Sequence, residues 1–371
     1  MKKVLSLLLV TAMSLSLLAG CGGGDGNSSK SNGGANPSTS GTTVDTSNRK
    51  DLVICMPEEI ETFDPISTSA MNTQAITNMM YVRLYLEDTN AELYECLAQD
   101  FNVISDTEIQ ITIKDGFKFT DGSDITTEDV VFTLNRALES PNFSTLLATV
   151  EAFEVVDAST FRITTTGPSP SIKLALSHPG TGILPKAYVE QALSTGDWSN
   201  PVCSGPFKLE ERKVGESVKV VKNDTYADPN TQAQCNSLTF RYVPEASSRT
   251  VLVETGEADV NFSFATADYD RASKDSNLKI HEHSGTVTQY IGVDTTMAPF
   301  DNKLVRQALC YAINREDVIT VVAEGLGSPA YGVLPPSTNG HLENPSNYTY
   351  DPETAKELLT QAGYPNGFET K

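Results

Sequence analysis

Residues 290–336 constrain the fold of this chain more than any other segment. Apolar and polar residues alternate over 290–294, which predicts a strand. A turn at 298–301 precedes apolar residues that recur with helical spacing over 305–313. Asn314 then predicts the N-cap of a second helix, since its side chain can accept a hydrogen bond from the first turn. The segment therefore predicts a strand that leads into two packed helices, and it carries no catalytic motif.

The length and charge of the chain limit its organisation and its partners. A chain of 371 residues exceeds one ordinary domain, so two or more lobes are expected. The formal net charge is -21, and such a surface repels the phosphates of nucleic acids. The charge can steer cationic ligands or serve solubility alone, and the second interpretation is favoured. We therefore expect no nucleic-acid partner.

Five short motifs follow one another in the constraining segment. They are YIGVDT (290–295), PFD (299–301), VRQAL (305–309), YAINR (311–315) and PP (335–336). Their order and spacing resemble those of the family 5 extracytoplasmic solute-binding proteins, the peptide- and nickel-binding receptors of ABC importers. The family pattern there is Y-x-G-x-(D/N)-T, P-F-D, V-R-x-A-(L/I), Y-A-I-(N/D)-R and P-P. Any one of these motifs is weak evidence for the family, whereas five in the same order and spacing are specific to it.

Two further blocks extend the resemblance. Residues 114–132 resemble the family's K-G-V-K-F-H-D-G-x-P-(L/V)-T-A-E-D-V-V-F, with departures at Asp115, Thr120 and Asp124. Residues 350–368 resemble Y-D-P-E-x-A-K-x-L-L-x-x-A-G-Y-P-x-G-F nearly letter for letter. The resemblance covers about 52–368 and leaves the C-terminal part of the family without a counterpart.

The resemblance implies an α/β, two-lobed periplasmic-binding-protein-like fold of type II, a Venus flytrap, with an extra small subdomain. It assigns 51–70 and 167–265 to lobe 1, 71–166 to the small subdomain and 266–371 to an incomplete lobe 2. The C-terminal part of lobe 2 and the closing strands of lobe 1 are then absent. We interpret the chain as truncated, and a genuinely shorter relative is the alternative.

The N-terminus is typical of a secreted, tethered protein. Residues 1–20 combine two lysines with a short apolar run, which predicts a signal peptide. Residues 18–21 read LAGC and resemble the lipobox of bacterial lipoproteins, in which Cys21 is acylated. An ordinary signal with an incidental cysteine is the alternative. Residues 21–50 are rich in Gly, Ser, Asn and Thr, which predicts a flexible tether. The protein should sit on the outer face of the cell membrane, or on the periplasmic side if the host has an outer membrane.

The resemblance also implies where a ligand would lie. In the family, residues just after an Asp-Pro turn line the cleft and offer main-chain hydrogen bonds to the bound peptide, as in strand addition. A Gly-Pro turn faces the ligand as well, and an aromatic residue of the small subdomain is a further candidate. For the residues after the Asp-Pro turn, the alternative is a plain strand-to-helix loop. For the aromatic residue, the alternative is packing in the core. The predicted contacts are Ser69, Ala70, Met71, Phe143, Ser204 and Gly205.

These features predict a membrane-anchored receptor that captures oligopeptides, or di- and tripeptides, and delivers them to an ABC permease driven by a partner ATPase. A receptor for nickel chelates or oligosaccharides on the same fold is the alternative. A secreted hydrolase is disfavoured, because the sequence contains no H-E-x-x-H or G-x-S-x-G motif. We expect a monomer that is not an enzyme and needs no metal or cofactor. Of the six cysteines, Cys203 and Cys235 could form a disulfide.

The lipid anchor can be tested by a single substitution. Cys21→Ser removes the thiol that the lipid would modify, so we expect the variant to lose incorporation of labelled palmitate and to leave the membrane fraction. Cys235→Ser is the matched control and should stay in the membrane fraction. Membrane retention of Cys21→Ser after high-salt washing would contradict the lipobox interpretation.

Overall fold

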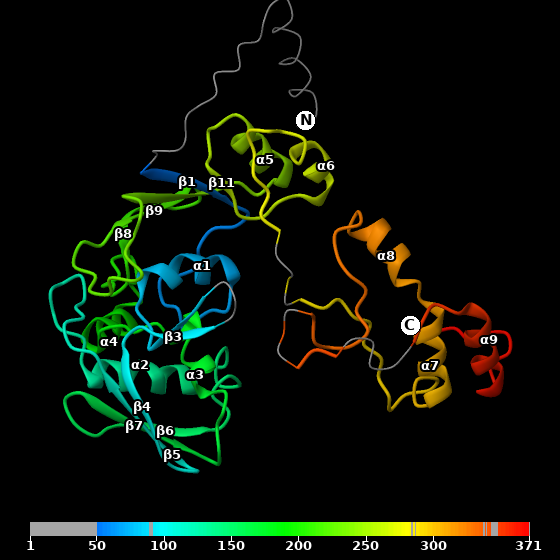
Figure 1. The fold of residues 1–371 in the computed structure, drawn as a ribbon, viewed down its shortest axis with the longest axis horizontal. Helices are drawn as coiled ribbons and strands as arrows, with labels where there is room; N and C mark the ends of the chain where they lie inside the picture. The colour runs from blue at the N-terminus through cyan, green and yellow to red at the C-terminus, as the bar shows by residue number, and fades with distance from the viewer. Residues whose placement is uncertain are drawn as a thin grey trace, which may run out of the picture. The chain divides into compact units, whose positions relative to one another are not determined.

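The computed structural model describes residues 50–88, 92–282, 285, 287–336, 338, 340–342 and 348–370 (Figure 1). The predicted signal peptide, Cys21 and all of the tether except Lys50 lie outside these described residues. None of the described helices is long and apolar enough to cross a membrane.

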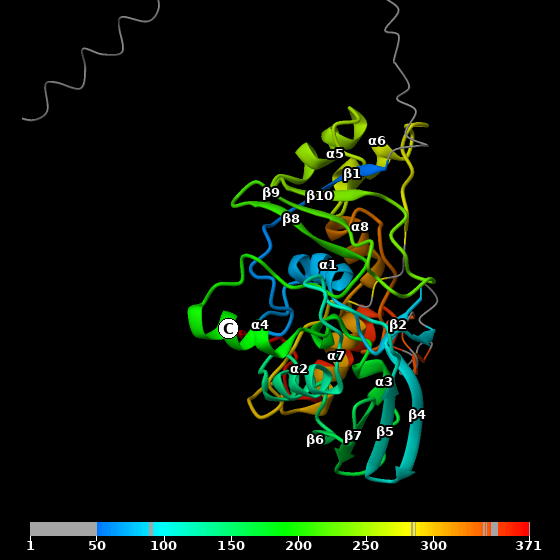
Figure 2. The same cartoon turned by 90° about the vertical axis from the view of Figure 1, so that its left-hand side faces the viewer.

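The first layer is a five-stranded sheet in the order β11-β1-β10-β9-β8 (Figures 1 and 2). Strand β1 is parallel to β10 and β11, whereas β8, β9 and β10 are antiparallel neighbours. The continuous apolar run of β1 agrees with its place between two neighbours. The strands are β1 (Asp51–Met56), β8 (Phe207–Lys213), β9 (Ser217–Lys222), β10 (Ser237–Tyr242) and β11 (Val260–Asn261).

The second layer is an antiparallel sheet in the order β4-β5-β7-β6. Its strands are β4 (Ala98–Ser105), β5 (Glu108–Ile113), β6 (Val150–Val155) and β7 (Thr160–Thr165). The alternation of apolar and polar residues over 108–113 predicts a strand with one buried face, and β5 confirms it, because its three isoleucines are buried and its other residues are half-exposed. Helix α2 (Thr127–Glu139) packs on β6 and β7, and Thr126 and Asp129 form a reciprocal capping box at its start. A small sheet of β2 (Tyr85–Glu87) and β3 (Leu93–Glu95) is separate.

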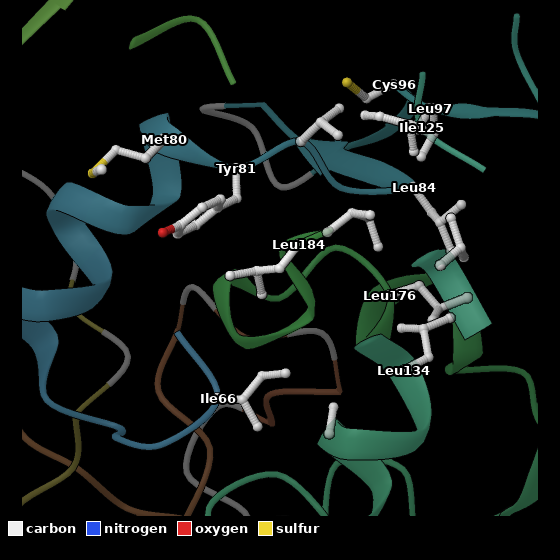
Figure 3. Close-up of a cluster of buried hydrophobic side chains, with 14 of the residues drawn as sticks. Ile66, Met80, Tyr81, Leu84, Cys96, Leu97, Ile125, Leu134, Leu176 and Leu184 are labelled. Atoms are coloured by element: carbon white, nitrogen blue, oxygen red, sulfur yellow. The ribbon is translucent and has the colours of Figure 1, made fainter. Parts of the chain in front are cut away.

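One hydrophobic core joins these two sheets through short helices. Apolar side chains from both sheets, α1 and α2 belong to a single buried cluster, part of which Figure 3 shows. The helices are α1 (Met71–Met80), α3 (Ile172–Ala175), the 3-10 turn η1 (Pro179–Thr181) and α4 (Lys186–Thr195). The sequence predicts a longer helix over 73–85, but Tyr81 is extended and the chain turns into β2. The reason is tertiary: the Met80 carbonyl accepts two amides from the segment that precedes β8.

Contacts continue across the predicted boundary between lobe 1 and lobe 2. Helix α5 (Ala246–Glu254) is followed by β11, the 3-10 turn η2 (Thr266–Asp268) and α6 (Tyr269–Ala272). Arg271 of α6 pairs with Glu254 of α5 and, at 2.9 Å, with Asp268. Tyr269 donates a hydrogen bond to Glu282. The boundary at 265/266 therefore lies within a packed region, and the division into lobes stays a prediction.

The described residues of 287–370 form a helical unit. Helix α7 (Lys303–Ala312) packs on α9 (Pro352–Gln361), and α8 (Arg315–Val322) follows α7 with Asn314 as its N-cap, as predicted. The strand predicted over 290–294 is absent, and Tyr290 is 85% exposed. A strand needs a hydrogen-bonded neighbour, and the described residues of 287–370 contain no other strand.

The five cysteines among the described residues are free thiols. Cys203 is fully buried and its thiol lies 3.5 Å from the Pro201 carbonyl. The disulfide that the sequence allowed between Cys203 and Cys235 is therefore not formed.

The cap of η1 predicts a pH-dependent stability. Nδ1 of His178 accepts the Gly180 N–H at 3.1 Å, so this nitrogen must be unprotonated. Burial and the nearby Arg83 guanidinium lower the pKa of His178. The unfolded chain binds the proton near pH 6.5 and the folded chain does not, so stability is intact above about pH 6.5 and falls as the pH drops below it.

Urea unfolding at pH 7.5 and pH 5.5 measures this loss. His178→Asn keeps an acceptor for the cap but does not titrate, so we expect it to lose less stability than the wild type between these values. Equal losses in the two proteins would rule out His178 as a source of the pH dependence.

Candidate functional site

The segment between β1 and α1 presents three of the six predicted contacts. Ser69 is exposed, Ala70 is half-buried and the Met71 side chain is 70% exposed. Ala70 is the N-cap of α1, and its methyl side chain offers no acceptor to the first turn of this helix. First-turn amides of a helix carry partial positive charge and seek acceptors. This part of the chain can therefore donate main-chain hydrogen bonds to carbonyl or carboxylate oxygens of a ligand.

Local hydrogen bonds give the segment a defined shape. The Ala70 N–H donates to Oγ1 of Thr68 at 3.0 Å, and the same hydroxyl donates to Glu61. The Glu61 N–H in turn donates to Oγ1 of Thr73 at 3.1 Å. Asn72 donates its side-chain amide to Glu58 at 3.1 Å. The start of α1 is thus tied to the chain that leaves β1, and carboxylates lie beside it.

Ser204 and Gly205 lie in the core and not on a surface. Both of their N–H groups donate to the Met80 carbonyl, at 3.0 and 2.8 Å. Oγ of Ser204 accepts the Val82 N–H and donates to the Ile183 carbonyl, each at 2.9 Å. With these donors occupied, the two residues join the end of α1 to β8 and offer no main-chain N–H to a ligand.

Phe143 is also buried. Its side chain is 2% exposed, its ring centre lies 5.2 Å from that of His178, and it presses on Gly180. This burial agrees with core packing, the alternative that the sequence left open for this residue.

The helical unit has a separate shallow pocket that sequence reasoning missed. It has a volume of about 220 Å³ and lies beside α7. None of the six predicted residues lines it. Its lining residues are Lys303, Arg306, Gln307, Cys310 and Tyr348. The signal in the sequence was faint, because polar positions of an amphipathic helix are ordinarily solvent-facing.

The described residues show no arrangement for metal binding. In this part of the chain, no group of three or more His, Cys, Asp or Glu side chains is placed to hold a metal ion.

Comparison with known proteins identifies relatives over most of the chain. Residues 92–371 match the model of the bacterial extracellular solute-binding proteins, family 5 (middle). The glutathione-binding protein GsiB of Escherichia coli K12 is 33% identical over 327 residues, which are 86% of this chain and 63% of GsiB. The chain thus spans about 63% of the length of this curated relative.

Solved structures agree with this match. DppA of Helicobacter pylori, in complex with the peptide STSA, is 25% identical with a TM-score of 0.74, over 86% of this chain and 67% of DppA. AppA of Bacillus subtilis, in complex with a nonapeptide, is 27% identical with a TM-score of 0.70, over 84% of this chain and 64% of AppA. These neighbours are type II periplasmic binding proteins, so the predicted α/β fold class is confirmed, and they contain parts that this chain lacks.

The close approach at Gly205 predicts a large effect of one added methyl group. A Cβ there would lie 2.6 Å from the Met79 carbonyl oxygen and 2.7 Å from the Met80 carbonyl carbon. Both are backbone atoms, so we expect Gly205→Ala to lower the free energy of unfolding by at least about 2 kcal/mol. Gly167→Ala is the control, because nothing lies within 4 Å of its Cβ. Equal urea midpoints for the two variants would contradict the packing at this junction.

Proposed function

Because this chain belongs to family 5 of the bacterial extracellular solute-binding proteins, we propose that it captures short peptides and delivers them to an ABC importer. One observation carries the proposal: relatives that match about 86% of this chain hold ligands with a peptide backbone, namely glutathione and the peptide STSA. Those relatives are binding proteins, so the proposed role is stoichiometric capture and not turnover.

Main-chain hydrogen bonds are the proposed means of capture. A peptide backbone offers carbonyl acceptors at regular intervals, and the first turn of α1 has donors that its N-cap residue, Ala70, does not cap. Contacts of this kind accept many side chains, since they read the backbone and not the sequence of the ligand. Ser69, Ala70 and Met71 remain proposed contacts, whereas Phe143, Ser204 and Gly205 support the core behind them.

Hinge closure is the proposed conformational step. In a two-lobed receptor, a ligand that touches both lobes only in the closed state stabilises that state by its differential binding free energy. The permease and its ATPase are proposed partners, and the energy for transport comes from that ATPase. A lipid on Cys21 would keep the receptor near the permease on the outer face of the membrane.

Thermal unfolding with defined ligands tests the proposal. Reduced glutathione or trialanine at 100 times its Kd adds about 2.7 kcal/mol to the free energy of unfolding, which raises Tm by several degrees. A nickel–histidine chelate and a trisaccharide are run in parallel. If only the chelate or the trisaccharide stabilises the protein, the proposed ligand is a chelate or a sugar and not a peptide. Cleavage of the added peptide would indicate a hydrolase.

A substitution at Met71 tests the proposed contact directly. Met71 is the first residue of α1, where proline is tolerated, and Ala70 before it is already extended. Met71→Pro therefore removes one N–H donor and keeps the helix, while Met71→Ala removes the side chain and keeps the donor. We expect Met71→Pro to weaken trialanine binding by about fivefold beyond Met71→Ala, the value of one hydrogen bond. Equal affinities of the two variants in calorimetry would exclude the Met71 amide as a contact.

A further inference from the structure

The turn before α1 contains a buried carboxylate. Asp64 is 2% exposed and follows Phe63 in the chain that leaves β1. Its Oδ1 accepts the Ile66 N–H at 3.2 Å, so the side chain shapes the turn around Pro65. Burying a carboxylate is unfavourable unless it is paired and hydrogen-bonded. The shape of this turn therefore depends on what neutralises Asp64.

Arg136 of α2 supplies the partner. Its Nη2 lies 2.8 Å from Oδ2 of Asp64, and its Nη1 lies 3.5 Å from Oδ1, so both arms of the guanidinium face the carboxylate. The Arg136 side chain is 17% exposed. Its Cζ lies 5.8 Å from the ring centre of Trp198. The ring of Tyr188 packs edge-on against that of Trp198, with 5.8 Å between the ring centres. The aromatic ring limits where the guanidinium can go, and two-armed pairing limits its orientation.

The end of α2 holds the same turn at a second point. Ser140 donates its hydroxyl to the Ile66 carbonyl at 3.0 Å, and the Asn142 side chain approaches that carbonyl at 3.5 Å. On the side of α1, the Tyr81 hydroxyl donates to the Phe63 carbonyl at 2.8 Å. The turn is thus held by side chains from α2 and from the residues that follow α1 and α2, and Arg136 of α2 is the only one among these that carries a charge.

We propose that Arg136 is a positioning residue for ligand capture: by holding Asp64 it places residues 69–71 at the start of α1. The inference rests on the proposed function, because those residues are its proposed contacts. Only two residues separate Ile66 from Ser69, so a shift of the turn is passed to the contact segment over at most about 10 Å of chain. The ion pair of Asp64 and Arg136 also joins a residue of predicted lobe 1 to one of the predicted small subdomain. Arg136 then has a role in binding although it touches no ligand itself.

Hydrogen exchange and calorimetry on one set of variants test this inference. Arg136→Met leaves Asp64 buried without its charge partner, so we expect amides of 64–71 in the unliganded protein to exchange at least tenfold faster. Trialanine or glutathione should bind about tenfold more weakly. Arg162→Met is the matched control, because Arg162 makes a 2.8 Å ion pair with Glu154 on an exposed face of the same subdomain. It should change neither quantity.

A double variant separates positioning from stability. Asp64→Asn with Arg136→Met removes the buried charge but keeps an acceptor for the Ile66 N–H. We expect its Tm to recover toward the wild-type value while its affinity stays weakened, since the turn then lacks its charged tie to α2 and keeps only the Ser140 and Asn142 contacts. A purely structural role would restore affinity together with Tm. Arg136→Lys keeps the positive charge but loses the two-armed pairing of the guanidinium, so its exchange rates and affinity should be intermediate. This variant also replaces Arg136→Met in the test if Arg136→Met does not fold.

The outcomes for the two proposals are distinct. If the wild type binds peptide and Arg136→Met binds it equally well, or if exchange over 64–71 is unchanged in Arg136→Met, the positioning role is overturned and the proposed function stands. If the wild type binds neither glutathione nor trialanine, the proposed function fails. Exchange in the unliganded variants then decides alone whether Arg136 holds the turn, and the ligand-positioning inference falls with the function.

Discussion

The carbonyl of Met80 is the interaction on which the rest of the N-terminal region depends. It lies at the end of α1 and accepts the N–H groups of Ser204 and Gly205, which are more than 120 residues away in sequence. The Ser204 hydroxyl extends this junction to Val82 and Ile183. Three segments therefore meet where no side chain larger than hydrogen fits at position 205. A buried junction of this kind has to satisfy every polar group that it removes from water.

This junction explains the ends of the neighbouring elements. Helix α1 stops at Met80 because its last carbonyl is used by another segment, and the chain continues as the extended residues that lead to β2. Strand β8 begins two residues after Gly205, in the sheet that also holds β1. Helix α1 is therefore held at both ends. The junction holds its C-terminus, and the Asp64 turn lies just before its N-terminus. A rigid support behind a binding segment lowers the entropy that is lost when a ligand orders it.

Much of the local structure was predictable from sequence. The alternating pattern of β5 and the N-cap Asn314 are as expected, because each depends on residues within one strand or one turn of each other. The motifs of the C-terminal helices identified the family before any fold was known. Among the predicted contacts, Ser69, Ala70 and Met71 are accessible at the surface. The family pattern did not reveal that the Ser204 and Gly205 amides are already used.

The sequence by itself determined the family, the α/β class and the N-cap of α8, because these follow from short-range patterns and from motifs in a fixed order. Tertiary structure alone decided where α1 ends, that 290–294 has no strand and that Phe143 packs in the core. It also decided that Arg136 reaches Asp64 across 72 residues of sequence. The physical reason is the same in each case. Which carbonyl takes an amide, and which cation neutralises a buried carboxylate, depend on segments that are distant in sequence and are brought together only by folding.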